Sequence, residues 1–349
     1  MKLILEDGTR LEGKSFGADT AVAGEVVFNT GMVGYVESLT DPSYEGQILV
    51  LTYPLVGNYG VPVKDLFESG RIHAKGLVVS EYSEQYSHAS ATRSLGAWLK
   101  KEGIPAITGI DTRLLTKKLR ERGTMLGKLT HGSEKIAWYD PDTENQVAIA
   151  SPHKKTTHGN GPATIVLVDC GAKENIARLI TRPGIRVVRV PWDYDFTKEA
   201  YDGVLISNGP GDPTFCKETI KHLQKAFTKN KPILGICLGT QLMALAAGAK
   251  TYKLKYGHRS HNQPCIDMIN GTRCYITSQN HSFAVRAKSL PRNWGVWMQN
   301  ANDGTVEGIF HKTKPFKAVQ FHPEASPGPT DTEWIIDDFV AAVKKQAKK

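Results

Sequence analysis

The segment 231–248 (KPILGICLGTQLMALAAG) constrains the fold of this chain more than any other. Residues 232–234 are a short apolar run typical of a buried strand, and residues 240–247 have a helical composition. Cys237 lies at the bend between them, with a glycine two residues away on either side. This strand, sharp turn and helix form the nucleophile-elbow pattern, with Cys as the nucleophile, and the helix N-terminus favours its thiolate. A buried structural cysteine is the alternative, and this segment alone does not decide.

The chain length and composition indicate a globular protein with two domains. The 349 residues suffice for two cores, and 40% hydrophobic and 23% charged residues are ordinary values. No apolar run reaches the length of a membrane span, and residues 1–5 are too short for a signal-peptide core. The five scattered cysteines indicate a reducing compartment. We therefore expect a cytoplasmic protein without a membrane partner.

The net charge of +9 raises the question of nucleic-acid binding. Basic residues are densest at 117–122 and 344–349, and the second run ends an amphipathic helix, where lysines complement the helix dipole. Neither run interleaves aromatic with basic residues, as single-strand binders do. We expect solvated helix faces and no nucleic-acid partner.

The first 150 residues predict a β-rich α/β domain. Residues 3–5 and 10–16 flank Asp7-Gly8, a strong hairpin signal, and further strands are expected at 47–52 and 76–80. Helices are expected at 90–102 and 111–122. Residues 8–15 formally match a phosphate-binding P-loop, but that loop needs a helix directly after it. The residues that follow are β-rich, so we do not expect a P-loop.

Residues 151–163 (SPHKKTTHGNGPA) are nearly devoid of apolar side chains and predict a linker. From residue 164 to 349 apolar strands alternate with helices, which predicts a doubly wound, mainly parallel sheet. The expected elements are strands at 164–169, 186–190, 203–207 and 233–236, and helices at 173–180 and 217–229. Beyond Gly248 we expect more strands, a hairpin at 302–304, a strand at 316–321 and a final helix from about 332. Ligands of such sheets bind at the carboxyl ends of the strands, where the elbow lies.

His322 is the best candidate base for Cys237. It follows a predicted strand and precedes Pro323, which holds the backbone extended. Positions two apart in an extended chain share a face, so Glu324 lies beside His322. Glu324 then orients one ring nitrogen while the other faces the sulfur, as in a catalytic triad. A solvated surface loop is the alternative for this short motif.

The segment 207–213 (SNGPGDP) ends a predicted parallel strand. Its glycines would let backbone N–H groups approach a substrate and hold an oxyanion, with the N–H of Leu238 as the second donor. An ordinary tight loop is the alternative.

His258, His261 and Cys265 hint at a metal site, but they lack a partner cluster with structural-zinc spacing, and we expect no bound metal.

Taken together, GICLGTQ at 235–241, SNGPGDP at 207–213 and HPE at 322–324 resemble the class I (triad) glutamine amidotransferase family. The segments NTGMVGY (29–35), LTDPSY (39–44), LTYP (51–54), SQNHSF (278–283) and EASPGP (324–329) are similar to the carbamoyl phosphate synthase small-subunit family. The resemblance spans nearly the whole chain in the expected order.

The resemblance implies that a Cys237, His322 and Glu324 triad hydrolyses L-glutamine through a γ-glutamyl thioester. It assigns glutamine binding to Ser43, Gly209, Gly211, Leu238, Gln241, Asn280, Ser282 and Phe283. It also implies that the partner is a large synthetase subunit, which uses ATP, Mg and bicarbonate and receives the ammonia for arginine and pyrimidine synthesis. No cofactor is expected in this chain.

Two departures from the family pattern stand out. Ser282 occupies a position where many small subunits have Gly, and the segment 258–264 (HRSHNQP) differs from the commoner form.

Two other functions compete with the implied one. The chain could serve an anthranilate, GMP or other synthetase, although those relatives lack a domain like residues 1–150. It could also be a non-catalytic basic binding protein on the same fold.

Overall fold

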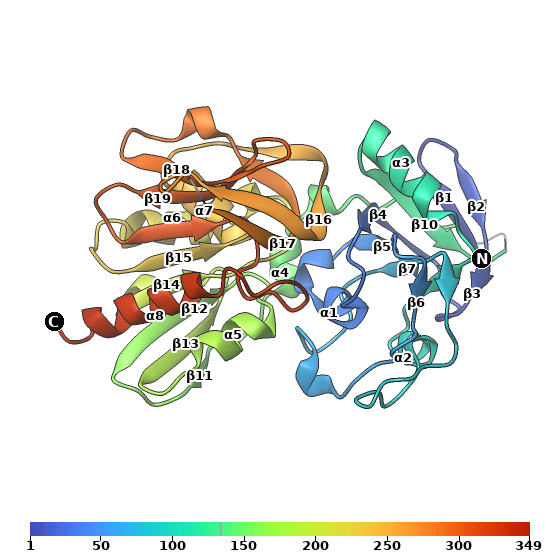
Figure 1. Ribbon diagram of the computed structural model, residues 1–349, viewed down its shortest axis with the longest axis horizontal. Coiled ribbons are helices and arrows are strands. Elements are labelled where there is room, and N and C mark those ends of the chain that lie inside the picture. The colour runs from blue at the N-terminus through green and yellow to red at the C-terminus, as the bar shows by residue number, and fades with distance from the viewer. Residues whose placement is uncertain (133–134, 272) are drawn as a thin grey trace. The chain divides into compact units, whose positions relative to one another are not determined.

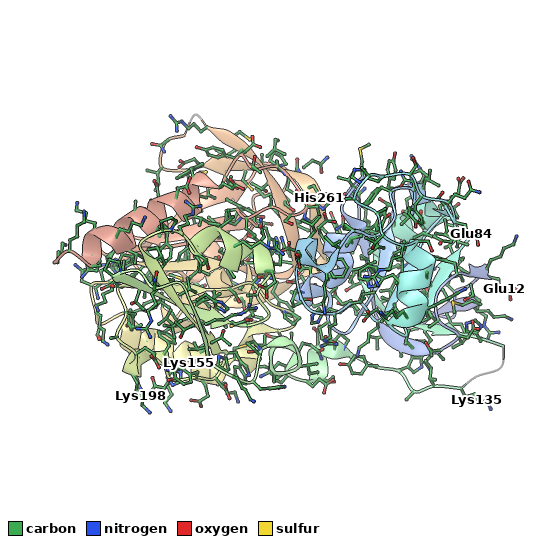
Figure 2. All side chains as sticks on the ribbon, turned by 90° about the horizontal axis from the view of Figure 1, so that it is seen from below. Glu12, Glu84, Lys135, Lys155, Lys198 and His261 are labelled. Atoms are coloured by element: carbon green, nitrogen blue, oxygen red, sulfur yellow. The ribbon has the colours of Figure 1, made fainter. Side chains whose placement is uncertain are left out.

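The structure, a computed structural model, describes residues 1–132, 135–271 and 273–349. The chain divides into two compact units, Met1–Glu144 and Asn145–Lys349 (Figure 1). Charged side chains such as Lys155 and Lys198 project outward from the second unit (Figure 2). Within the described ranges, no helix has both the length and the apolar composition needed to cross a bilayer.

The first unit is built on a mixed sheet. Its hairpin at Asp7-Gly8 is confirmed, since the two flanking strands pair antiparallel. Among the described residues the sheet has eight strands, in the order β2 (Arg10–Glu12), β1 (Lys2–Leu5), β10 (Met125–Thr130), β4 (Val22–Asn29), β5 (Gln47–Leu51), β7 (Gly76–Val78), β9 (Ala106–Thr108) and β3 (Lys14–Ser15). Short strands β6 (Leu55–Val56) and β8 (Glu81–Tyr82) pair separately.

Helices of the first unit are α1 (Tyr35–Thr40), α2 (Leu95–Lys101) and α3 (Thr112–Arg122). The Asp111 side chain caps α3 by accepting from the N–H of Leu114, and Gly123 ends it with a φ of 105°. The P-loop match at 8–15 has no helix after it, because Lys14 and Ser15 form strand β3 and the chain continues to β4. Backbone geometry therefore excludes a phosphate-binding loop there.

The second unit confirms the predicted doubly wound sheet. The five strands at its centre are mutually parallel neighbours: β13 (Ile185–Pro191), β12 (Ala163–Asp169), β14 (Gly203–Ile206), β15 (Ile233–Ile236) and β20 (Phe316–Val319). Helices α6 (Lys217–Ala226) and α7 (Leu238–Ala246) cover one face, and α5 (Glu174–Ile180) and α8 (Trp334–Gln346) cover the other (Figure 1). Successive side chains along each strand point alternately into these two cores, because both faces of the sheet are covered by helices.

An antiparallel extension continues the sheet beyond β20. It consists of β19 (Val306–His311), β17 (Cys274–Val285), β16 (Thr251–Asp267) and β18 (Trp294–Asn300). The expected hairpin at 302–304 joins β18 to β19, which pair antiparallel. The long strands β16 and β17 matter for the site, because β17 runs beside the elbow helix α7.

The stretch 151–163 differs from the predicted linker. It contains β11 (Thr156–His158), which pairs antiparallel with β13 at the edge of the sheet, and helix α4 (Gln146–Ala150) precedes it within the second unit. An edge strand with all side chains exposed needs no apolar residues, so composition alone did not reveal it. Helix α2 is also shorter than the expected 90–102, because the side chain of Ser94 caps it.

Candidate active site

Cys237 lies at a strained bend between β15 and α7. Its φ of 52° and ψ of −104° are unusual for a residue with a side chain. A Cβ added to Gly239 would lie 2.3 Å from the backbone oxygen of Ile206, and one added to Gly235 would lie 2.7 Å from the backbone carbon of Gly239. Both glycines are therefore required by close backbone packing, as the elbow pattern predicts.

Hydrogen bonds fix the elbow against two neighbouring segments. The N–H of Cys237 donates to the oxygen of Val319 in β20, at 2.8 Å, and the N–H of Gly239 donates to the oxygen of Ser207, at 3.1 Å. Strands β15 and β20 are parallel neighbours, so their carboxyl ends meet at the same sheet edge. The sequence places Cys237 directly after one strand and His322 shortly after the other.

His322 and Glu324 form the expected pair. The Nδ1 atom of His322 lies 2.6 Å from Oε1 of Glu324, and the N–H of His322 donates to the oxygen of Ser278 at 2.9 Å. The Nε2 atom makes no hydrogen bond of standard geometry with the described residues, but the ring interacts electrostatically with Cys237. Burial lowers the pKa of His322, whereas Glu324 and Cys237 raise it more strongly, so the ring favours the protonated form.

Lys173 is a site residue that the sequence analysis missed. Its Nζ atom lies 3.1 Å from Oε1 of Glu324, and it also donates to the oxygen of Ala325. Burial raises the pKa of Glu324, but Lys173 and His322 lower it further, so this carboxyl stays ionised. Lys173 precedes a helix without any motif, and only the fold brings it to Glu324, 151 positions further along the chain.

Several predicted glutamine-binding residues surround the sulfur. The Sγ atom of Cys237 lies 3.6 Å from the oxygen of Asn280. The Nε2 atom of Gln241, one turn into α7, donates to the oxygen of Phe283 at 2.8 Å. Strand β17 is thus held against the elbow by both ends of its Asn280–Phe283 stretch.

The glycine loop after β14 also lies at the elbow. A Cβ on Gly209 would lie 2.1 Å from the oxygen of Cys170 and 2.8 Å from Cδ2 of Leu238. Gly211 has a φ of 78°, which favours glycine. This loop therefore brings bare backbone close to the first residue of α7, as an oxyanion site requires.

Ser282 and Ser43 each make a hydrogen bond within their own unit. The Nη2 atom of Arg259 in β16 donates to the hydroxyl of Ser282, so this side chain engages the protein itself. Ser43 lies in the first unit, in the short 3₁₀ turn η1 (Pro42–Tyr44), where its N–H donates to Oδ1 of Asp41 at 2.9 Å. Its role in glutamine binding stays a prediction.

The sulfur is well covered, since Cys237 is 2% exposed. The Nε2 atom of Gln320 contacts it at 3.6 Å. A glutamine side chain must therefore displace groups around the sulfur in order to reach it. The arrangement is the one expected of a nucleophile, a base and an orienting acid in a buried site.

The parallel sheet, the cysteine elbow and the histidine–glutamate pair define a glutamine amidotransferase of the triad type. Residues 166–342 match the family model "Glutamine amidotransferase class-I", and residues 3–129 match "Carbamoyl-phosphate synthase small chain, CPSase domain". The chain belongs to the carbamoyl-phosphate synthase small-chain family.

Curated relatives agree with this assignment. The carbamoyl phosphate synthase arginine-specific small chain of Aspergillus fumigatus is 48% identical, over 98% of this chain and 79% of the relative. The multifunctional protein CAD of Squalus acanthias is 52% identical, over 98% of this chain and 16% of the relative. The chain spans between 16% and 21% of the length of the multifunctional relatives that it matches. Among solved structures, a putative GMP synthase component from Thermoplasma acidophilum is 26% identical, with a TM-score of 0.47, over 55% of this chain and 100% of that chain.

Proposed function

We propose that this chain hydrolyses L-glutamine to glutamate and ammonia, and that it supplies the ammonia to a synthetase that makes carbamoyl phosphate. One observation carries this proposal. The elbow sulfur of Cys237 and the His322–Glu324 pair follow adjacent parallel strands and interact with each other. The match of residues 3–129 to the small-chain domain favours carbamoyl phosphate synthesis over service to another synthetase.

The chemistry follows from the geometry. The thiolate of Cys237 attacks the side-chain carboxamide carbon of glutamine, and backbone N–H groups of Leu238 and the Gly209 loop hold the oxyanion. His322, protonated at rest, gives a proton to the departing ammonia. The neutral ring then takes a proton from water, which attacks the γ-glutamyl thioester and releases glutamate and the free thiolate. Glu324 orients the ring and stabilises its charge throughout.

The ATP, Mg and bicarbonate chemistry belongs to the synthetase in this proposal. We place the activity in the cytoplasm, where a reducing environment keeps the catalytic thiol free. The name of the arginine-specific small chain supports a product that serves arginine synthesis, and service to pyrimidine synthesis is implied by the family resemblance alone.

Ammonia release from glutamine tests the proposal. Purified protein should release ammonia, and Cys237→Ala should reduce this release to background, since the nucleophile is lost. Cys274→Ser is the matched control, because Cys274 is exposed and free. Undiminished ammonia release by Cys237→Ala would contradict the catalytic assignment and favour a binding protein on this fold. Co-purification of an ATP-using synthetase tests the partner.

A further inference from the structure

Two buried histidines and a buried glutamate converge where strands β16, β17 and β19 lie side by side. His258 of β16 and His281 of β17 are register partners, and Glu307 comes from β19. One ligand atom from each of the three side chains lies within 4.8 Å of the others. The Nδ1 atom of His258 lies 3.3 Å from Oε1 of Glu307, and the Nε2 atom of His281 lies 3.8 Å from it. These separations approach the roughly 3.3 Å expected between ligands of a tetrahedral zinc ion at about 2.0 Å.

Both rings are oriented from outside the cluster. The Nε2 atom of His258 lies 2.8 Å from Oδ2 of Asp303, and the Nδ1 atom of His281 lies 2.9 Å from the oxygen of Phe283. When each ring is neutral and donates to its outer acceptor, the inner nitrogen presents a lone pair. Metal-binding histidines show this pattern, with a carboxylate or carbonyl behind the ring.

The cluster has more hydrogen-bond acceptors than two neutral rings can serve. The inner nitrogen of His258 faces the carboxylate of Glu307, and that of His281 faces both Glu307 and Oε1 of Gln279, at 3.1 Å. The two rings therefore meet acceptors on all four nitrogens, whereas two neutral imidazoles carry only two N–H groups. Oε2 of Glu307 is also buried without a hydrogen-bond partner among the described residues. A single divalent cation would satisfy the inner nitrogens and the carboxylate together.

We propose that His258, His281 and Glu307 bind one divalent transition-metal cation, for which Zn²⁺ is the best match. Imidazole and carboxylate ligands suit this ion, and the Oε1 atom of Gln279 is available as a fourth ligand. This set differs from the sequence hint, because His261 (Figure 2) and Cys265 are not part of the cluster. Sequence spacing missed it since the three ligands come from three strands.

The cation would join three strands, two of which, β17 and β19, have little pairing with each other. Strands β17 and β19 share a single register pair, Val285 with Val306, next to Glu307. The pairing of β16 with β17 has a register shift between Lys253 and His258. A cation held by all three strands would hold β17 in place, including the stretch that contacts Cys237. The proposal concerns binding of the ion and does not depend on the proposed glutaminase activity.

Metal content tests the proposal directly. The full chain, stripped with a chelator and then supplied with Zn²⁺ and desalted, should retain one zinc per chain by mass spectrometry. Added Zn²⁺ should raise its unfolding temperature. Co²⁺ in its place should give visible d–d bands without thiolate charge-transfer absorption, because no cysteine is a ligand. Glu307→Gln and His258→Asn should each bind zinc about 100-fold more weakly.

Three variants separate this site from other zinc ligands. His153→Asn removes an exposed histidine, Cys274→Ser an exposed thiol and Cys237→Ser the elbow thiol, and all three should retain the ion. Cys237→Ser should bind zinc while lacking glutaminase activity, so the two proposals fail independently. If the wild-type protein neither retains stoichiometric zinc nor shows a thermal shift, the metal-site proposal is overturned. In that case a proton on His258 links Glu307 to Asp303. Unchanged binding by Glu307→Gln with native circular dichroism overturns it as well. Where that variant does not fold, the wild-type result and His258→Asn decide.

Discussion

At the scale of single residues, Glu324 connects the catalytic pair to the stability of the fold. It is fully buried, with Lys173 and His322 as its charged neighbours. Their positive charges outweigh the effect of burial, so its pKa in the folded chain lies below the ordinary value. The carboxyl group therefore serves two purposes, because the charge that orients His322 also offsets the buried ammonium.

The pH dependence of unfolding follows from this pKa. Unfolded Glu324 takes up a proton near pH 4.3, whereas the folded form resists protonation until lower pH. Its stabilising contribution is complete above that pH and is lost as the pH falls toward the folded pKa. We expect Glu324→Gln to lose about 3 kcal/mol at pH 7, because Lys173 and His322 keep unpaired charge. The deficit relative to wild type should shrink at pH 3 to 4 in urea unfolding; an equal deficit at both pH values would contradict the assignment.

Lys173 gives a prediction for activity. Lys173→Met removes the ammonium that keeps Glu324 ionised, so we expect kcat to fall about tenfold or more. The acid limb of the pH profile should move to higher pH, since the pKa of Glu324 rises. Lys155→Met is the matched control, because Lys155 is exposed and pairs with Glu199 instead. A loss of activity without movement of the acid limb would assign Lys173 a purely structural role.

At the scale of secondary-structure elements, the elbow depends on the absence of two side chains. Gly239→Ala places a Cβ 2.3 Å from the backbone oxygen of Ile206, and this backbone atom can move aside only at a substantial cost in free energy. We expect a loss of about 3 kcal/mol in the free energy of unfolding, together with loss of activity. Gly248→Ala is the control: its φ is 93° but nothing lies within 4 Å, so it should cost about 1 kcal/mol. Equal costs for both, measured by denaturant unfolding, would contradict the packing argument.

Local sequence signals predicted some elements and site residues, whereas those that depend on long-range contacts were not predictable. The elbow was predictable because its glycines and apolar strand are local signals, and so was the Asp7-Gly8 hairpin. The pairing of His322 with Glu324 was expected from an extended chain, but residues 323 and 324 form a turn, in which the N–H of Ala325 donates to the oxygen of His322. Lys173 and Glu307 were not predictable, because each acquires its role from side chains on distant strands. The edge strand β11 was missed because it buries nothing.

At the scale of the whole molecule, the two units have separate hydrophobic cores. One cluster lies entirely within the first unit, around Leu49, Leu77 and Trp98. The two clusters of the second unit lie on opposite faces of its sheet and contain the elbow residues Cys237 and Leu238. Each unit therefore buries its own apolar surface, which is the requirement for independent folding.

A truncated chain tests this independence and separates it from glutamine binding. We expect the fragment 145–349 to unfold cooperatively, with near-native circular dichroism, because its cores and its triad are all internal. Its affinity for glutamine should be lower than that of the full chain, since the family resemblance assigns Ser43 of the first unit to substrate binding. Ser43→Ala in the full chain should raise KM with little change in kcat or unfolding. Full glutamine affinity in both the fragment and Ser43→Ala would remove Ser43 from the site, whereas an unfolded fragment would mean that the second unit relies on the first for its stability.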